Sequence, residues 1–470
     1  MSGLEAVEMQ LSELEFSGRI DSEYYRKTFL VYEEIIANRE HCDLLNVANF
    51  LIGPFGSSYD TSNYVEKSEY RYMRGQDVKP FLLMDTEPRY IDKNDFERLS
   101  KYALNESDIL ISVVGTLGNA CIVRKNDIPA IFSCKSMVIR VTDINAHFLV
   151  TYFNSKHGRE LLLRKERGAI QKGLNLDDLR LLVIPKFSSI FELYIENLVL
   201  SAHGLLDDSK SKYSDAESLL LAELSLTNFT PSIVSITVKS FIESFGTSGR
   251  LDAEYYQEKY EEILVAIKSY KGGYSSIGEL AKYLFTGEYS ENYENKADGL
   301  RFYIRGTNMN NGHIVIDESY YVNPSGFTKV VASGDIVTGR VGTLGVFAEI
   351  CDNLEGAIYS DNVLCFRLPE KYFPSVYTLL LNTEFIRALV ERASRGSVQQ
   401  RLNQETLREL IVPLLSFEIQ NNIDHILQKS FDLRRKSEQL LESAKQAVEM
   451  AIEQGEEAAI TWLDANKGDK

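Results

Sequence analysis

Hydrophobic positions along the chain follow two kinds of spacing, and these alternate in the same order twice. Short stretches of alternating apolar residues, punctuated by Gly, Asn and Asp, predict β-strands and turns. Later stretches carry apolar residues at helical spacing, HFLVTYFNSKHGRELLLRKE from His147 and SVYTLLLNTEFIRALVERA from Ser375. Each set ends in a strand-like segment, LLVIP or LIVPL. The pattern therefore predicts a β-rich part followed by helices, present twice.

A long amphipathic segment follows each set, over residues 188–226 and 417–459. Pro185 and Pro413 stand just before these segments, as prolines often do at a helix boundary. A helix of about 40 residues is ~60 Å long, more than one domain needs. We predict that the two helices pair as an antiparallel coiled coil that holds the globular parts apart. The alternative is that each helix packs on its own domain.

Blocks of similar sequence recur in the same order at nearly constant separation. The pairs are SGRIDSEYY from Ser17 with SGRLDAEYY from Ser248, YMRGQDV from Tyr72 with YIRGTNM from Tyr303, VGTLG from Val114 and from Val341, RGAIQKGLN from Arg167 with RGSVQQRLN from Arg395, and LRLLVIP from Leu179 with LRELIVP from Leu407. The period is too long for a solenoid, so whole domains are duplicated. We predict an α+β fold with repeated domains of mixed β-sheet and helices at 1–186 and 237–415, and helical segments at 187–236 and 416–470.

Composition fits a soluble globular protein: of 470 residues, 44% are hydrophobic and 25% are charged. No apolar run approaches the ~18 residues of a membrane span, and the acidic N-terminus lacks the features of a signal peptide. We therefore expect a cytoplasmic protein with no membrane contact. The five cysteines are scattered without a CxxC pair, which indicates reduced thiols rather than a metal site.

Sequence motifs for catalysis are missing. There is no DPPY or NPPY tetrapeptide of an amino-methyltransferase, no P-loop, and no HExxH or His–Cys cluster among six histidines. We expect no catalytic residues, no metal and no cofactor in this chain. The net charge of −17 argues against a surface coated for nucleic-acid binding, although it leaves room for a small basic cleft.

The order of repeated unit, long helix, repeated unit and long helix resembles the specificity subunit of type I restriction–modification enzymes. The resemblance rests on SGRIDSEYY and SGRLDAEYY, YMRG and YIRG, SDILISVVGTLG and GDIVTGRVGTLG, and the blocks that begin at Gln171 and Gln399. It covers essentially the whole chain. It implies two target-recognition domains, each reading one half of a split site in double-stranded DNA, and a conserved helical spacer that docks two methyltransferase subunits.

The same resemblance implies a non-catalytic chain in a larger host-defence complex with restriction and translocase subunits. S-adenosylmethionine would then belong to the partner methyltransferase, and ATP and Mg to the partner endonuclease. Two alternatives stay open. One is a two-domain protein-binding adaptor without base readout, and the other is the recognition part of a combined methyltransferase–nuclease.

The VGTLG loop has three interpretations: a scaffold turn, a DNA-backbone contact or a nucleotide loop. Strand-like sequence follows it in both copies, whereas a phosphate cradle usually opens a helix. We predict a turn in which the glycines supply positive φ. Base-reading positions are expected where the copies differ, and Arg340 replaces Val113 just before the second loop.

Candidate DNA contacts lie in RKERGAIQKGLN and ERASRGSVQQRLN, because Arg and Lys neutralise phosphates and Arg or Gln can pair with base edges. We expect Gly168 and Gly396 to break the preceding helix and to place the candidates on a loop. These candidates are Arg167, Gln171, Lys172, Arg395, Gln399, Gln400 and Arg401. The alternative is that they are solvated loop residues or cap the next helix.

Arg74 and Arg305, each before a glycine at a strand end, are further candidates. A fold-stabilising ion pair and a phosphate contact are both open for them. Arg19 with Asp21 and Arg250 with Asp252, in contrast, are predicted to form local structural pairs.

Overall fold

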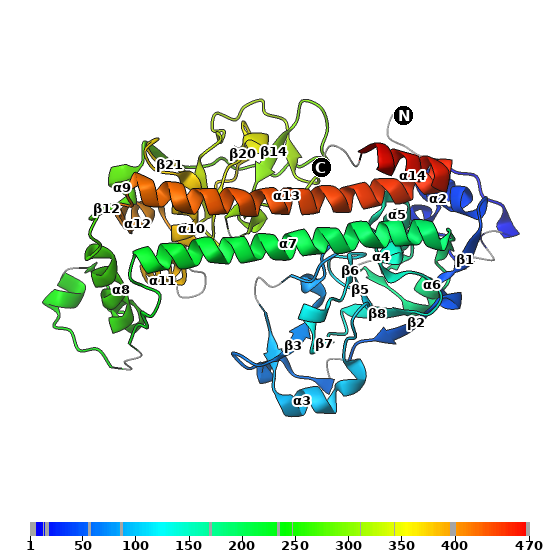
Figure 1. Ribbon diagram of the computed structural model, residues 1–470, viewed down its shortest axis with the longest axis horizontal. Coiled ribbons are helices and arrows are strands. Elements are labelled where there is room, and N and C mark those ends of the chain that lie inside the picture. The colour runs from blue at the N-terminus through cyan, green and yellow to red at the C-terminus, as the bar shows by residue number, and fades with distance from the viewer. Residues whose placement is uncertain are drawn as a thin grey trace. The chain divides into compact units, whose positions relative to one another are not determined.

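The computed structural model of the chain describes residues 6–12, 14, 18–54, 58–84, 88–168, 172–232, 236–246, 248–310, 312–342, 344–394 and 401–466. The chain forms two compact units. Unit 1 is Met1–Leu206 with Arg434–Lys470, and unit 2 is Asp207–Leu433. Each unit contains one sequence repeat and part of both long helices (Figure 1). The four-segment division of the sequence stays a prediction.

Each unit is built on a four-stranded antiparallel sheet with the same strand order, β2-β8-β5-β6 in unit 1 and β13-β21-β18-β19 in unit 2. The strands are β2 (Ala48–Ile52), β8 (Ser136–Val141), β5 (Ile109–Ser112), β6 (Ala120–Ile122), β13 (Tyr283–Thr286), β21 (Val363–Arg367), β18 (Ile336–Gly339) and β19 (Phe347–Glu349). They occupy corresponding places in the two sequence repeats, so the duplication predicted from sequence is a duplication of fold.

A second, three-stranded sheet also recurs, as β4-β3-β7 and as β17-β14-β20. In both copies the central strand pairs antiparallel on one side and parallel on the other. The strands are β4 (Tyr90–Ile91), β3 (Tyr70–Met73), β7 (Ala130–Phe132), β17 (Tyr321–Val322), β14 (Arg301–Ile304) and β20 (Ile358–Tyr359).

Short strand pairs complete the sheets. β1 (His41–Asp43) with β11 (Val183–Pro185) corresponds to β12 (Tyr274–Ser276) with β22 (Ile411–Pro413). The hairpins β9 (Glu166–Arg167) with β10 (Gly173–Leu174), and β15 (Met309–Asn310) with β16 (His313–Ile314), each occur in one unit within the described ranges.

The predicted helices are present after the sheets. They are α4 (Ala146–Asn154) and α5 (Lys156–Arg164) in unit 1, and α10 (Pro374–Asn382) and α11 (Glu384–Ala393) in unit 2. Further helices in the two units are α2 (Lys27–Ala37), α3 (Lys93–Arg98), α6 (Leu176–Arg180), α8 (Glu258–Lys268), α9 (Ile277–Leu280) and α12 (Gln404–Glu409).

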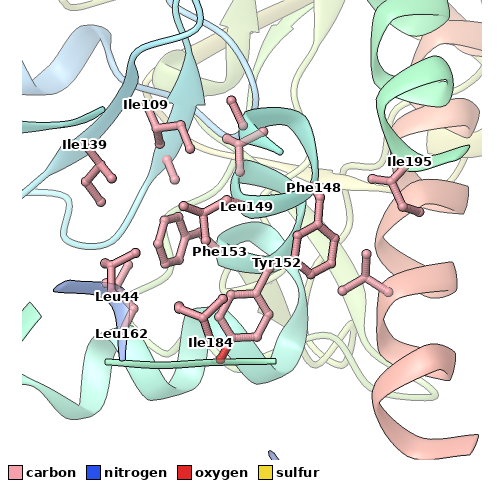
Figure 2. Close-up of a cluster of buried hydrophobic side chains, with 14 of the residues drawn as sticks. Leu44, Ile109, Ile139, Phe148, Leu149, Tyr152, Phe153, Leu162, Ile184 and Ile195 are labelled. Atoms are coloured by element: carbon pink, nitrogen blue, oxygen red, sulfur yellow. The ribbon is translucent and has the colours of Figure 1, made fainter. Parts of the chain in front are cut away.

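The core of unit 1 lies between α4 and the large sheet. Figure 2 shows Phe148, Leu149, Tyr152 and Phe153 of α4 among strand and helix side chains such as Ile109. All are fully buried, and each aromatic burial contributes about 1.5–3 kcal/mol. The hydroxyl of Tyr152 donates to the Val183 carbonyl at 2.9 Å, so its polar end is satisfied within the core.

The long helices are α7 (Ser189–Glu223) and α13 (Phe417–Gln454). The prediction that the second helix continues to residue 459 was wrong, because Gly455 adopts φ 103° and separates α13 from α14 (Glu456–Ala465). No helix in the described ranges is both long and apolar enough to span a membrane.

The long helices pair antiparallel (Figure 1). Small residues lie at the contact. In unit 1, Ser437 Oγ donates to the Ala202 carbonyl at 2.6 Å. In unit 2, the buried Ser209 and Ser430 each donate to the other's carbonyl at 2.8 Å. These reciprocal bonds satisfy the hydroxyls inside the helix contact. The predicted α+β class, with repeated sheets and an antiparallel pair of long helices, is confirmed.

A buried aspartate paired with a partly exposed arginine holds the central strands together in each unit. Asp108 accepts from Arg140 Nε at 3.0 Å, joining β5 to β8, and Asp335 accepts from Arg367 Nε at 2.8 Å, joining β18 to β21. Each aspartate also accepts a backbone N–H from the preceding turn. The aspartate shared by SDILISVVGTLG and GDIVTGRVGTLG therefore stabilises the fold in both units.

The VGTLG loop closes the β5–β6 hairpin in unit 1 and the β18–β19 hairpin in unit 2. Its glycines all have positive φ, from 70° at Gly345 to 89° at Gly115. An L-residue would be strained at these positions. The prediction of a scaffold turn with left-handed glycines is confirmed.

The repeated SGR motif forms a cation–π stack. Arg19 and Arg164 lie 4.4 and 4.2 Å from the Tyr24 ring centroid, and Arg19 also pairs with Asp21. In unit 2 the Tyr255 ring is stacked by Arg250 and Arg392, both at 4.5 Å, and Arg250 pairs with Asp252. The prediction of local structural pairs is confirmed.

His157 of α5 makes the stability of unit 1 depend on pH. It is fully buried beside the Tyr32 ring, and its Nε2 lies 3.2 Å from Glu453 Oε1 on α13. Burial lowers the pKa of His157 from 6.5 to about 4, against the pull of Glu453. Between these values the unfolded chain binds a proton that the folded unit excludes, so stability falls as the pH falls from 6.5 towards 4.

We therefore expect the urea midpoint of unit 1, followed by fluorescence of the single tryptophan, Trp462, to be lower at pH 5 than at pH 7.5. His157→Phe should reduce this difference, and His41→Gln, at an exposed position, is the matched control. An equal pH dependence in His157→Phe and the unaltered chain would contradict this assignment.

Candidate nucleic-acid interface

The divergent residue pair at 113 and 340 sits in the same backbone frame in both units. In unit 1, Val113 N–H donates to the Lys135 carbonyl at 2.9 Å, and the Val113 carbonyl accepts from Leu174 N–H at 3.0 Å. In unit 2, Arg340 makes the same two bonds, with the Asn362 carbonyl at 2.8 Å and with Leu402 N–H at 2.9 Å. Positions 113 and 340 are therefore structurally equivalent, as are 135 and 362.

The VGTLG loops lie beside the C-terminal ends of the predicted DNA-contact blocks. Val114 bridges to Gly173 in unit 1, and Val341 bridges to Arg401 in unit 2. The structure thus brings Arg340 and Arg401 together at the end of β18. Gln171, Arg395, Gln399 and Gln400 lie outside the described residues, and so does Gly396.

The parallel strand pairs bring Arg74 and Arg305 to the same end of the sheets. Arg74 follows β3, whose last carbonyl accepts from Ser133 N–H at 2.9 Å, just before Lys135. Arg305 follows β14, whose last carbonyl accepts from Ser360 N–H at 2.9 Å, just before Asn362. We call these groups the strand-end edge: residues 74, 113, 135 and 173 in unit 1, and 305, 340, 362 and 401 in unit 2.

Arg74 is held by a carboxylate. Its Nη2 lies 2.7 Å from Asp77 Oδ1, and both side chains are largely buried. Arg305 is held differently, because Asn308 takes the place of Asp77 in the capping turn. Its guanidinium carbon lies 3.1 Å from the Tyr320 ring centroid, and Asp317 is 3.8 Å away. An internal ion pair is therefore present for Arg74, and a ring stack dominates for Arg305.

Arg340 is oriented by backbone rather than by an acid. Its Nη1 donates to the Asp361 carbonyl at 3.0 Å, and its buried Nε has no hydrogen-bond partner among the described residues. In that same part of the chain, no carboxylate forms an ion pair with Arg340, Arg401 or the exposed Lys135.

Arg167 and Lys172 differ from the expected loop placement. Helix α5 ends at Arg164, before Gly168, and Arg167 lies on β9, paired with Gly173 of β10. Gly168 directly follows β9 and takes φ 110°, and the helix has already ended four residues earlier. The expectation that Gly168 breaks the helix and puts Arg167 on a loop was wrong.

Both cations of this hairpin are neutralised locally. Arg167 makes two hydrogen bonds to Asp178, at 2.6 and 2.7 Å, and these raise the pKa of Arg167. Lys172 Nζ lies 2.5 Å from Glu166 Oε1. Both side chains are about half exposed, so they remain reachable.

Sequence reasoning missed Lys135 and Asn362, which lie outside every repeated block. The available signal was the alignment of KSMVIRV with NVLCFRL through Arg140 and Arg367. Lys135 and Asn362 are the first residues of these segments, directly before β8 and β21, and they differ. Across the described part of the chain, His, Cys, Asp and Glu form no group of three or more suited to a metal ion.

No family model matches the chain, and no curated protein matches it. The matches are among solved structures. The chain is similar to S subunits of type I restriction–modification systems. The S subunit from M. genitalium matches with 12% identity and a TM-score of 0.39, over 88% of this chain and 95% of that one.

The HsdS subunit from Thermoanaerobacter tengcongensis matches with 15% identity and a TM-score of 0.29, over 88% of this chain and 97% of that S subunit. The type IIG restriction endonuclease BpuSI matches with 13% identity and a TM-score of 0.30, over 41% of this chain and 30% of the endonuclease. These identities give no residue-by-residue correspondence.

Proposed function

We propose that the chain is the DNA-specificity subunit of a type I restriction–modification complex, and that each unit reads one half of a bipartite site. The observation that carries the proposal is the contrast between the repeats. The Asp–Arg pair, the cation–π stack and the glycine turn recur in both units, while the side chains at the strand-end edge differ at every position except the one held by Arg74 and Arg305. Reading two unlike half-sites calls for this combination, because phosphate contacts position a domain and base contacts specify the sequence.

The charges at the strand-end edge support the same function. Lys135, Arg340 and Arg401 have no carboxylate partner among the described residues, whereas Arg74, Arg167 and Lys172 do. In a chain of net charge −17, unpaired cations are the places where DNA phosphates or base edges are attracted. The acidic remainder of the surface would then disfavour non-specific binding.

In this proposal the chain is not an enzyme. Helices α7 and α13 offer the docking surface for two methyltransferase subunits, and restriction or translocase subunits join the larger complex. S-adenosylmethionine would be held by the methyltransferase, and ATP and Mg by the endonuclease.

The test is co-expression with candidate methyltransferase subunits, followed by genome-wide mapping of methylated bases. We expect a bipartite motif, and exchange of residues 17–185 for the corresponding unit of another S subunit should change one half of it. The matched control exchanges the same residues with their own sequence recoded.

A protein-binding adaptor would instead assemble with partners without directing sequence-specific methylation. A chain that never assembles with a methyltransferase, or an exchange that leaves the motif unaltered, would refute the proposed function.

A further inference from the structure

One backbone hydrogen bond at the strand-end edge joins a residue pair that carries one cation in each unit, but the cation stands on opposite partners of that bond. We call the pair of positions 113 and 135 in unit 1, and 340 and 362 in unit 2, the recognition rung. In unit 1 the rung is Val113 and Lys135, and in unit 2 it is Arg340 and Asn362. The backbone hydrogen bond across the rung is the same in both, 2.9 Å and 2.8 Å.

The side chains of the rung are placed differently in the two units. In unit 1, Val113 at the end of β5 is buried and has no polar side-chain group. Its partner Lys135, in the segment before β8, is exposed and lies beside Gly75. A Cβ on Gly75 would lie 3.0 Å from Lys135 Cβ, which shows how closely the two chain segments approach.

In unit 2, Arg340 at the end of β18 carries a guanidinium, whose Nη1 donates to the Asp361 carbonyl at 3.0 Å. Its partner Asn362, directly before β21, donates its backbone N–H to Ser360 Oγ at 3.1 Å. The side-chain amide of Asn362 is exposed, and its Nδ2 lies 3.3 Å from Asp361 Oδ1. A planar guanidinium and a carboxamide thus stand side by side where unit 1 has one flexible ammonium.

We propose that the recognition rung determines the base preference of each unit, an inference that rests on the proposed function. The guanidinium of Arg340 suits the O6 and N7 acceptors of guanine, and the amide of Asn362 suits the N6 and N7 groups of adenine. The ammonium of Lys135 is a point charge without the planar fork, so it selects less strictly. Unit 2 therefore reads at this rung by bidentate pairing, and unit 1 through a single ammonium nitrogen.

The test moves the unit 1 rung into unit 2 of the full chain, as the double variant Arg340→Val with Asn362→Lys. The complex with its methyltransferase is then used for methylation mapping. We expect discrimination at one position of the second half-site to fall about ten- to hundred-fold, with the first half-site unchanged. The matched control is Lys282→Asn, which removes an exposed cation at the opposite end of the same sheet and should leave both half-sites unchanged.

A second variant, Arg340→Lys, keeps the positive charge and removes the planar guanidinium. It is the smaller change, so it still tests the inference if the double variant does not fold. We expect it to lose discrimination at the same position while DNA affinity changes little. An unaltered second half-site in a folded variant, beside a bipartite motif for the unaltered chain, would overturn the inference and leave the proposed function standing. Absence of any bipartite motif with the unaltered chain would overturn the proposed function, and the rung with it.

Discussion

Replacement of Asp335 by alanine is expected to lower the free energy of unfolding of unit 2 by about 3–5 kcal/mol. The Asp335 carboxylate is fully buried and accepts from Arg367 Nε at 2.8 Å, from the Tyr283 hydroxyl at 2.5 Å and from Ala332 N–H at 2.8 Å. Its loss leaves the Tyr283 hydroxyl, the Ala332 N–H and the Arg367 charge without this acceptor. Arg367 is partly exposed, so water can recover part of the cost.

The measurement is urea unfolding at neutral pH, comparing Asp335→Ala with Asp335→Asn and Asp317→Ala. Asparagine keeps one acceptor oxygen and should cost less than alanine. Asp317 is 44% exposed and only 3.8 Å from Arg305, so its replacement should cost less than about 1 kcal/mol. A similar loss in Asp335→Ala and Asp317→Ala would show that the buried pair does not hold the strands of unit 2 together.

Replacement of Gly287 by alanine is expected to cost about 3 kcal/mol and to weaken recognition of the second half-site. A Cβ at Gly287 would lie 2.0 Å from the Tyr359 carbonyl oxygen and 2.5 Å from that of Ser360. Backbone atoms cannot turn away as a side-chain tip can, so the loop that carries Asn362 must move.

Gly53 occupies the corresponding place in unit 1, where a Cβ would lie 2.3 Å from the Ser133 carbonyl oxygen. Gly53→Ala should therefore weaken the first half-site and spare the second. Gly299→Ala is the control, because nothing lies within 4 Å of its Cβ position, although its φ of 83° still costs about 1 kcal/mol. Thermal melts and methylation maps report the two effects. Equal behaviour of Gly287→Ala and Gly299→Ala would contradict the steric explanation.

The repeated blocks were enough to predict that the fold is duplicated, because they mark residues whose role is the same in both units. VGTLG marks a left-handed turn, and the SGR motif marks a cation–π stack. The end of α13 was misplaced, since Gly455 stands inside an otherwise continuous helical pattern and only its backbone φ reveals the break.

The candidate site was harder to predict, because it depends on which residues meet across strands. The sequence contains Arg74 and Asp77 three positions apart, but whether they pair depends on the capping turn after β3. Lys135 and Asn362 became candidates only when backbone hydrogen bonds placed them opposite Val113 and Arg340. Arg167 was expected on a loop, but it pairs with Gly173 in a hairpin. The two strands of this hairpin are two residues long each, which is too short for a pattern of alternating apolar residues to reveal.

The backbone bonds of the recognition rung have a consequence for how such a protein can evolve and be redesigned. They join main-chain atoms, so they form whether the rung holds Val with Lys or Arg with Asn. Under the proposed function, sequence preference can therefore drift by single side-chain exchanges at the rung, while the buried aspartates and crowded glycines that fix the fold stay as they are. Under the proposed function, a library confined to positions 135, 340 and 362 would sample new half-sites while every residue of the buried ion pairs and of the crowded turns keeps its identity.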